Sequence, residues 1–155
     1  GAHVRRGRAR PAAVLGGGEP HRISLSDAIL IKDTHLAILP LEEAVRRAKR
    51  ASLYRKVEVE VNQPEEAVSA ALAGADIVML DNMPPEAVER TIADLGQRDL
   101  RRRIVLEVSG GIDASNFDRF ARLDVDVISM GALTHSVRNF DVCLEVLKGA
   151  KSFRL

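Results

Sequence analysis

Short apolar segments alternate with amphipathic segments along most of this chain. Five segments have the length and the content of β-branched residues that are typical of strands, and they cover residues 28–31, 57–61, 77–80, 104–108 and 125–130. The stretches between them carry apolar residues at helical spacing. Strands that alternate with single helices pair in parallel through right-handed crossovers, so the pattern predicts an α/β fold built on parallel strands.

Proline, asparagine and glycine mark the expected helix boundaries. Pro40 and Pro85 suit first helical turns, Asn62 is a candidate helix cap, and Gly74 is placed to end a helix. The residues predicted to face the core are Leu41, Ala44, Val45 and Ala48 in the first helix, Ala67, Val68, Ala71 and Leu72 in the second, Val88, Ile92 and Leu95 in the third, Phe117, Phe120 and Ala121 in the fourth, and Phe140, Leu144 and Leu147 in the last.

The number of strand and helix units bounds the architecture. Five or six units are visible, whereas a complete eight-stranded barrel needs about 250 residues. The 155 residues therefore predict a single domain, residues 1–155, that forms a partial TIM-like α/β barrel or an open parallel sheet. Because an unclosed sheet leaves strand edges that need covering, we expect a homo-oligomer.

Composition excludes several classes of protein. The 23 lysines and arginines balance 22 acidic residues to a net charge of +1, which argues against a general nucleic-acid binder. The chain has no apolar run near the roughly 18 residues of a membrane span, and Arg5, Arg6, Arg8 and Arg10 precede no hydrophobic signal region. The single cysteine, Cys143, excludes an internal disulfide and fits the reducing cytoplasm.

The segment 16–35 concentrates groups that bind anions. It joins three glycines at 16–18 to His21, Arg22 and Lys32, with Lys32 directly after a predicted strand. Taken singly, a glycine run, a His-Arg turn and a strand-end lysine are more often solvated than functional. Together, these cations could converge on a ligand that carries carboxylates or phosphates.

Polar residues and glycines recur where successive predicted strands end. Lys32 follows the first strand, Glu60 lies near the end of the second, and Asp81, Ser109 and Gly131 follow the next three. The carboxyl ends of parallel strands are where α/β folds place their binding sites. The recurrence predicts one site at this edge, and an ion pair with Arg22 or Lys32 is the alternative interpretation of the two carboxylates.

The alternating segment VEVEV has two interpretations. In a half-exposed antiparallel strand, the valines would face the core and Glu58 and Glu60 would face water. In a parallel barrel strand, the valines would face the helices and both glutamates the interior, where buried carboxylates need partners.

Two glycine-containing turns are candidates for binding phosphate. The turn 109–111 (SGG) follows a strand and precedes a predicted helix, and the turn 130–136 (MGALTHS) has the same placement. Backbone N–H groups and a helix dipole favour an anion in such turns, and a tight turn without a ligand is the alternative. Two adjacent turns of this kind are common in barrel phosphate sites.

These motifs resemble the quinolinate phosphoribosyltransferase family. Residues 16–35 read GGGEPHRISLSDAILIKDTH, close to the family's GGG-x-x-HR-x-x-L-x-D-x-x-LIKD-N-H, and MLDN, SGGI and GALTHS follow in the family's order and spacing. The resemblance covers residues 14–147. It implies an incomplete, seven-stranded α/β barrel, without the separate N-terminal domain that precedes the barrel in the family.

The resemblance also implies a reaction: phosphoribose passes from phosphoribosyl pyrophosphate to quinolinate with loss of carbon dioxide, giving nicotinate mononucleotide for NAD biosynthesis. Mg²⁺ is the implied cofactor, because it takes oxygen ligands from carboxylates and from substrate. By resemblance, His21, Arg22 and Lys32 contact quinolinate, Glu60 and Asp81 approach the phosphoribosyl group and the metal, Lys32, Glu60 and Asp81 are the catalytic set, and Ser109, Gly110, Gly111 and Gly131 bind phosphate.

The chain departs from the family pattern at Thr34, where the family has asparagine, and before residue 14, where the family's substrate-binding Arg and Lys motif is not matched. Two alternatives remain open at this point. One is a related nicotinate-type transferase of the same architecture. The other is a non-catalytic module that binds a phosphate ligand or takes part in assembly.

Overall fold

The structure, a computed structural model, describes residues 14–18 and 28–132 and contains one five-stranded parallel sheet. The strands lie side by side in chain order, and each pairs in parallel with the next. This confirms the predicted α/β fold and is the arrangement of a partial TIM-like barrel. The strands are β1 (Ala28–Ile31), β2 (Lys56–Val61), β3 (Ile77–Asp81), β4 (Val105–Ser109) and β5 (Val127–Ile128).

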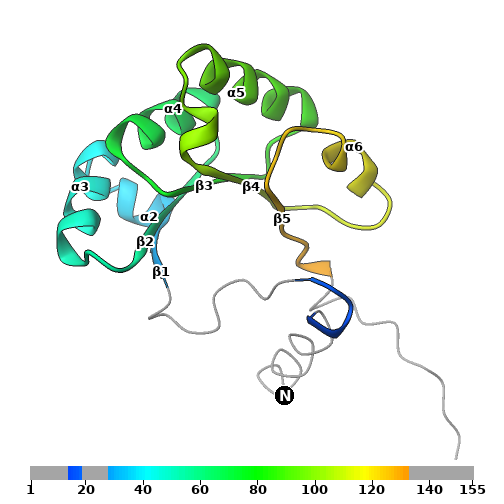
Figure 1. The fold of residues 1–155 in the computed structure, drawn as a ribbon, viewed down its shortest axis with the longest axis horizontal. Helices are drawn as coiled ribbons and strands as arrows, with labels where there is room; N and C mark the ends of the chain where they lie inside the picture. The colour runs from blue at the N-terminus through cyan, green and yellow to red at the C-terminus, as the bar shows by residue number, and fades with distance from the viewer. Residues whose placement is uncertain (1–13, 19–27, 133–155) are drawn as a thin grey trace, which may run out of the picture.

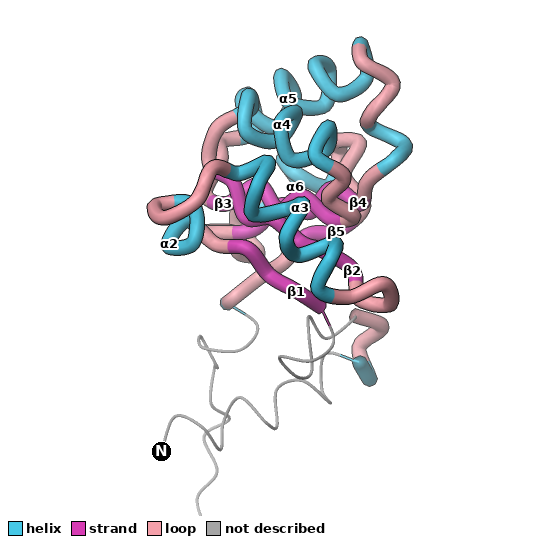
Figure 2. Tube along the Cα trace, turned by 90° about the vertical axis from the view of Figure 1, so that its left-hand side faces the viewer, coloured by secondary structure: helices cyan, strands magenta, loops and turns pink. Residues whose placement is uncertain are grey.

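The covering helices lie on one side of the sheet. In Figure 1 the strands form an arc, and α3, α4 and α5 follow its outer, convex side, with α6 beside β5. Figure 2 shows the same layering from the side. The helices are α2 (Asp33–Leu36), α3 (Leu41–Ala51), α4 (Pro64–Ala73), α5 (Pro85–Gln97), the 3-10 helix η1 (Arg101–Arg103) and α6 (Phe117–Ala121).

Alternation along the strands divides the sheet into two faces. Val57, Val59 and Val61 are buried in the core that the sheet forms with the helices. Neighbouring residues on a strand point to opposite faces, so Glu58 and Glu60 lie on the concave face. The parallel-barrel interpretation of VEVEV is therefore the correct one, and Glu58 is only 2% exposed.

The predicted helix faces need three corrections. Leu72 is 66% exposed, and Ala70 is buried in its place; Leu72 follows Ala70 by two positions, which is about 200° round the helix. In α6 only Phe120 is buried, whereas Phe117 and Ala121 are exposed. This helix covers the sheet end with one side chain because it is only 5 residues long.

Asn62 is not a helix cap. Gln63 occupies the N-cap position of α4, and Pro64 is its first residue. The Asn62 N–H instead donates to Glu66 Oε2 at 3.2 Å. The predicted end of this helix is confirmed, because Gly74 stands at the C-cap with a left-handed φ of 94°.

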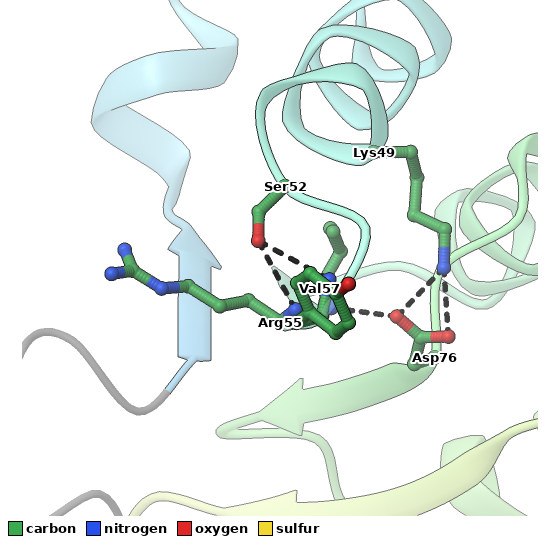
Figure 3. Close-up of polar contacts among 6 residues, drawn as sticks. Lys49, Ser52, Arg55, Val57 and Asp76 are labelled. Carbon is green, nitrogen blue, oxygen red and sulfur yellow. Dashed lines mark hydrogen bonds and ion pairs between the residues drawn. The ribbon is translucent and has the colours of Figure 1, made fainter.

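An aspartate clamps β2 to β3 at the N-terminal edge of the sheet. The Asp76 carboxylate accepts the Val57 N–H at 2.7 Å and also two contacts from Lys49 Nζ, at 2.8 and 2.9 Å (Figure 3). The Asp76 N–H donates in turn to the Val57 carbonyl at 2.9 Å. The start of β3 is thereby fixed to the start of β2.

The same device recurs between β4 and β5. The Asp126 carboxylate accepts the Leu106 N–H at 2.7 Å and Arg101 Nη1 at 2.9 Å. The Asp126 N–H returns a bond to the Leu106 carbonyl at 2.9 Å. Burial alone would raise the pKa of Asp126, but the hydrogen bonds from Arg101 and Leu106 and the Arg101 charge outweigh it and lower the pKa.

Some predictions fall outside the described residues. They concern the basic cluster, the cysteine and the last helix, namely Arg5, Arg6, Arg8, Arg10, Phe140, Cys143, Leu144 and Leu147. Within residues 14–18 and 28–132, none of the helices has the length and apolar content needed to cross a membrane.

Candidate functional site

The candidate residues gather at the C-terminal edge of the sheet. Asp81 pairs directly with Ser109 in the β3–β4 register. Ile31 pairs with Val59, which sets Lys32 beside Glu60 at the end of the neighbouring strand pair. The parallel register therefore brings together the strand-end residues that the sequence placed at separate positions.

Lys32 and Glu60 form an ion pair across β1 and β2. Lys32 Nζ lies 2.8 Å from Glu60 Oε2, with the lysine side chain 48% exposed and the glutamate side chain 16% exposed. The hydrogen bond to Glu60 raises the pKa of Lys32 above its ordinary value of 10.5, against a lowering by burial, and the charges of Glu60, Asp33 and Asp81 add to the rise. Lys32 therefore keeps its positive charge near neutral pH. The ion pair with Lys32, which was the alternative interpretation of the two carboxylates, is present for Glu60.

Asp81 is held by the residue that follows it. Asn82 Nδ2 donates to Asp81 Oδ2 at 2.8 Å, and the Asn82 N–H donates to the Ser109 carbonyl at 2.9 Å. Asn82 has a φ of 54°, in the left-handed region. Because the charge of Asp81 acts on the pKa of Lys32, the two groups share one electrostatic environment.

The 109–111 turn needs glycine for two reasons. Gly110 and Gly111 have φ values of 87° and 63°, which side chains rarely tolerate. A Cβ on Gly110 would also lie 2.4 Å from Asn82 Oδ1 and 2.7 Å from the Asn82 nitrogen. The close approach of Asn82 accounts for Gly110 without a ligand, so the phosphate-binding role of this turn stays a prediction.

The helix that was predicted to follow this turn is present as α6, but it begins only at Phe117. Residues 112–116 separate the turn from α6. They begin with the buried Ile112, and Asn116 Nδ2 donates to the Gly111 carbonyl at 2.9 Å. With only 5 residues, α6 has little dipole to offer. Any anion at this turn would depend on backbone N–H groups.

The other candidates lie at or beyond the limit of the described residues. Gly131 is in the last described turn, after β5, and Ala132 begins a helical conformation. His21 and Arg22, together with His135 of the second predicted turn, lie outside the described residues.

The sequence reasoning missed a carboxylate on the concave face. Glu107, in the middle of β4, is only 4% exposed and accepts a hydrogen bond from Ser129 Oγ. Its signal was available, since LEVS places a glutamate inside an apolar strand as VEVEV does. Together with Glu58, it gives the concave face two buried carboxylates.

The described residues contain no ready-made metal cage. Residues 14–18 and 28–132 hold no group of three or more His, Cys, Asp or Glu side chains placed to bind a metal ion. Glu60 is engaged by Lys32, whereas the hydrogen bond to Asp81 uses Oδ2. A cation here would need substrate oxygens as ligands, which is how Mg²⁺ is usually held.

The fold and these strand-end residues define the chain as an α/β protein of the incomplete-barrel class. Residues 6–145 match the family model described as "Quinolinate phosphoribosyl transferase, C-terminal domain". The chain belongs to this family.

Curated relatives and solved structures agree with the family match. The chain is 48% identical to the probable nicotinate-nucleotide pyrophosphorylase [carboxylating] of Methanothermobacter thermautotrophicus, over 88% of this chain and 50% of the relative. A NadC deletion mutant superposes with a TM-score of 0.79 at 40% identity, covering 88% of this chain and 47% of the other. NadC from Streptococcus pyogenes gives a TM-score of 0.76 at 41% identity, covering 84% of this chain and 45% of the other. The chain thus spans about half the length of the relatives that it matches.

Proposed function

We propose that this chain supplies the barrel portion of a quinolinate phosphoribosyltransferase that acts in NAD biosynthesis. The reaction transfers phosphoribose from phosphoribosyl pyrophosphate to the ring nitrogen of quinolinate, with loss of carbon dioxide. The observation that carries the proposal is the row of Lys32, Glu60, Asp81 and the 109–111 turn along one edge of the sheet. The names of the curated relatives support the same activity.

The proposed roles divide between the two substrates. Lys32 provides a cation for a quinolinate carboxylate, together with His21 and Arg22. A ligand carboxylate approaching Lys32 would share this cation with Glu60, whose oxygen is 2.8 Å away. That arrangement favours a ligand that brings further charge partners, as a dicarboxylate would with Arg22.

The phosphoribosyl group is proposed to lie over β3 and β4. Asp81 accepts hydrogen bonds from ribose hydroxyls, and the turn of Ser109, Gly110 and Gly111, with Gly131 beyond β5, receives the 5′-phosphate through backbone N–H groups. Glu60 helps to hold the ribosyl centre as positive charge develops on it. Catalysis is then positioning and electrostatic stabilisation, without a covalent nucleophile.

Magnesium is proposed as the cofactor that accompanies phosphoribosyl pyrophosphate. Asp81 is the better ligand of the two carboxylates, because Glu60 is already paired with Lys32. When bound, the ion would neutralise pyrophosphate charge. Asp81 would hold it directly or through water, with the remaining ligands from substrate and solvent.

The proposal includes partners beyond the small-molecule substrates. Relatives are about twice as long as this chain, and the edges of the sheet at β1 and β5 each have only one paired neighbour among the described strands. We infer a homo-oligomer that covers these edges. The single cysteine supports a reducing, cytoplasmic location.

The experiment titrates quinolinate and phosphoribosyl pyrophosphate separately into wild-type protein, Lys32→Ala and Lys49→Ala, made in this chain with any sequence that flanks it. Lys49 is the matched control, because it also forms an ion pair of 2.8 Å, but with Asp76 at the opposite edge of the sheet.

A hydrogen bond to a charged group contributes roughly 1.5–3 kcal/mol, so Lys32→Ala should weaken quinolinate by about one to two orders of magnitude. Phosphoribosyl pyrophosphate should lose less, and Lys49→Ala should change neither affinity. Equal losses for both ligands in Lys32→Ala, or no loss for quinolinate, would refute the assignment. Nicotinate that competes as well as quinolinate would favour the related nicotinate-type transferase instead.

A further inference from the structure

Asn82 has a backbone conformation that few residues adopt. Its φ of 54° is one of two positive values at non-glycine positions in residues 14–18 and 28–132, the other being 56° at Asp99. Asparagine tolerates this region better than most side chains because its short amide can bond locally. The conformation turns the chain sharply just after β3, where Asp81 ends the strand.

The side chain and backbone of Asn82 connect two strand ends. Its Nδ2 donates to Asp81 Oδ2 at 2.8 Å, and its N–H donates to the Ser109 carbonyl at 2.9 Å. Its amide group also occupies the space beside Gly110 where a Cβ would stand, with Oδ1 and Cγ at 2.4 and 2.5 Å from that position. One residue therefore contacts both the carboxylate and the turn that follows β4.

The donor type matters for what Asp81 can do. A lysine or arginine partner would neutralise the carboxylate, whereas an amide N–H fixes its orientation and leaves its negative charge. Asn82 bonds Oδ2, which leaves Oδ1 able to accept from a ligand. A carboxylate held in one orientation before binding loses less conformational freedom when a ribose hydroxyl or a metal ion binds to it.

We infer that Asn82 is a positioning residue for the phosphoribosyl substrate and acts through Asp81. The inference rests on the proposed function, since it requires Asp81 to contact that substrate. Asn82 is the last residue of the MLDN motif, but the resemblance and the substrate roles proposed above assign it no part.

The test is a double-mutant cycle read by binding of phosphoribosyl pyrophosphate with Mg²⁺. The four proteins are wild type, Asp81→Ala, Asn82→Gly and the double variant, because glycine keeps the left-handed backbone and removes only the side chain. If Asn82 acts mainly through Asp81, Asn82→Gly weakens binding about tenfold in wild type and less than about twofold in Asp81→Ala. Asp99→Gly makes the same backbone exchange at the other end of the sheet and should leave affinity unchanged.

Asn82→Asp gives a second readout that a purely structural role would not move. It preserves the size of the side chain but replaces the Nδ2–H donor with an oxygen that cannot donate to Asp81 Oδ2. Its loss of affinity for phosphoribosyl pyrophosphate should be at least as large as that of Asn82→Gly. Quinolinate affinity should change less than phosphoribosyl pyrophosphate affinity in both Asn82 variants.

Each other outcome has a distinct meaning. Full loss from Asn82→Gly in the Asp81→Ala background, no loss in wild type, or an equal loss in Asp99→Gly overturns the positioning role while leaving the proposed function intact. If wild type and Asp81→Ala bind phosphoribosyl pyrophosphate equally well, the role of Asp81 in the proposed function is refuted. The positioning role of Asn82 is then refuted too, because it acts through Asp81. Wild-type protein that binds neither substrate refutes the proposed function itself.

Discussion

Replacing Gly110 by alanine tests whether the turns that follow β3 and β4 pack as closely as the structure shows. The new methyl group would stand 2.4 Å from Asn82 Oδ1, 2.5 Å from Cγ and 2.7 Å from the Asn82 nitrogen. Rotation of the Asn82 side chain could relieve the first two contacts. The third involves backbone that is also bonded to the Ser109 carbonyl, so the two loops must move apart.

Two costs add in Gly110→Ala. The left-handed φ of 87° costs an alanine roughly 1–2 kcal/mol, and forcing a methyl group into a closely packed contact costs about 1–3 kcal/mol. A smaller gain of about 0.4–1 kcal/mol comes from the less flexible unfolded chain. We expect a net destabilisation of about 2–4 kcal/mol.

Gly74→Ala is the matched control. Gly74 has a φ of 94°, and a Cβ there would meet nothing within 4 Å. It therefore incurs the backbone cost without the contact, about 1 kcal/mol. The difference in the free energy of unfolding between the two variants, measured by urea denaturation, gives the cost of the contact between a side chain at position 110 and Asn82.

For a domain of this size, about 1–3 kcal/mol of difference separates the melting temperatures of the two variants by roughly 3–10 °C. Equal destabilisation of Gly110→Ala and Gly74→Ala would refute the close approach of Asn82. The contact between the strand-end turns would then be looser than the structure shows, and the left-handed φ of 87° alone would account for glycine at position 110.

Three further predictions concern the charged pairs. The pKa of Lys32 is raised in the folded state, so the stability that its pair with Glu60 contributes should be present below the ordinary lysine pKa and be lost as the pH rises through the raised pKa. The free energies of unfolding of Glu60→Gln and wild type, measured by thermal unfolding, should differ by less than about 1 kcal/mol at pH 8 and become equal in strong base. The pKa of Asp126 is lowered, so its contribution should be present above the ordinary aspartate pKa and be lost in acid. Its side chain is 44% exposed, so urea unfolding should show the charge-removing variant Asp126→Asn less stable than wild type by up to about 1 kcal/mol at neutral pH and closer to wild type at low pH. Asp76→Ala removes the acceptor of a strand amide and should cost about 1–3 kcal/mol in the same assay.

Contrary results would be informative in each case. A Glu60→Gln deficit that persists in strong base would show that the glutamate stabilises the fold other than through Lys32. An Asp126→Asn deficit that stays constant down to acid pH would point to packing rather than charge. A neutral Asp76→Ala would mean that the backbone bonds between β2 and β3 suffice without the carboxylate.

The alternation of apolar segments was enough to predict the class of fold. Parallel strands covered by helices are buried on the helical side. The strands therefore need apolar residues, and the helices need apolar residues at helical spacing, and both patterns can be read in the sequence. The strand at Ala28–Ile31 and the helix end at Gly74 followed from local chemistry. The VEVEV segment left two interpretations open, and the parallel pairing of β2 decided between them. The motifs also indicated the family before any geometry was known.

The tertiary structure decided which neighbours those residues meet. Lys32 and Glu60 are 28 positions apart in the sequence. Their ion pair was one of the interpretations that the sequence left open, and the β1–β2 register, which sets the two strand ends side by side, decided it. No local pattern assigns Asn82 to the space over Gly110, because that contact joins two loops after different strands. Leu72 failed as a core prediction because helical spacing gives a face but not the direction in which the helix is docked, and the docked helix buries Ala67 and Ala70 instead. Periodicity is a property of one element, whereas register, docking and loop contact depend on the packing of several elements together.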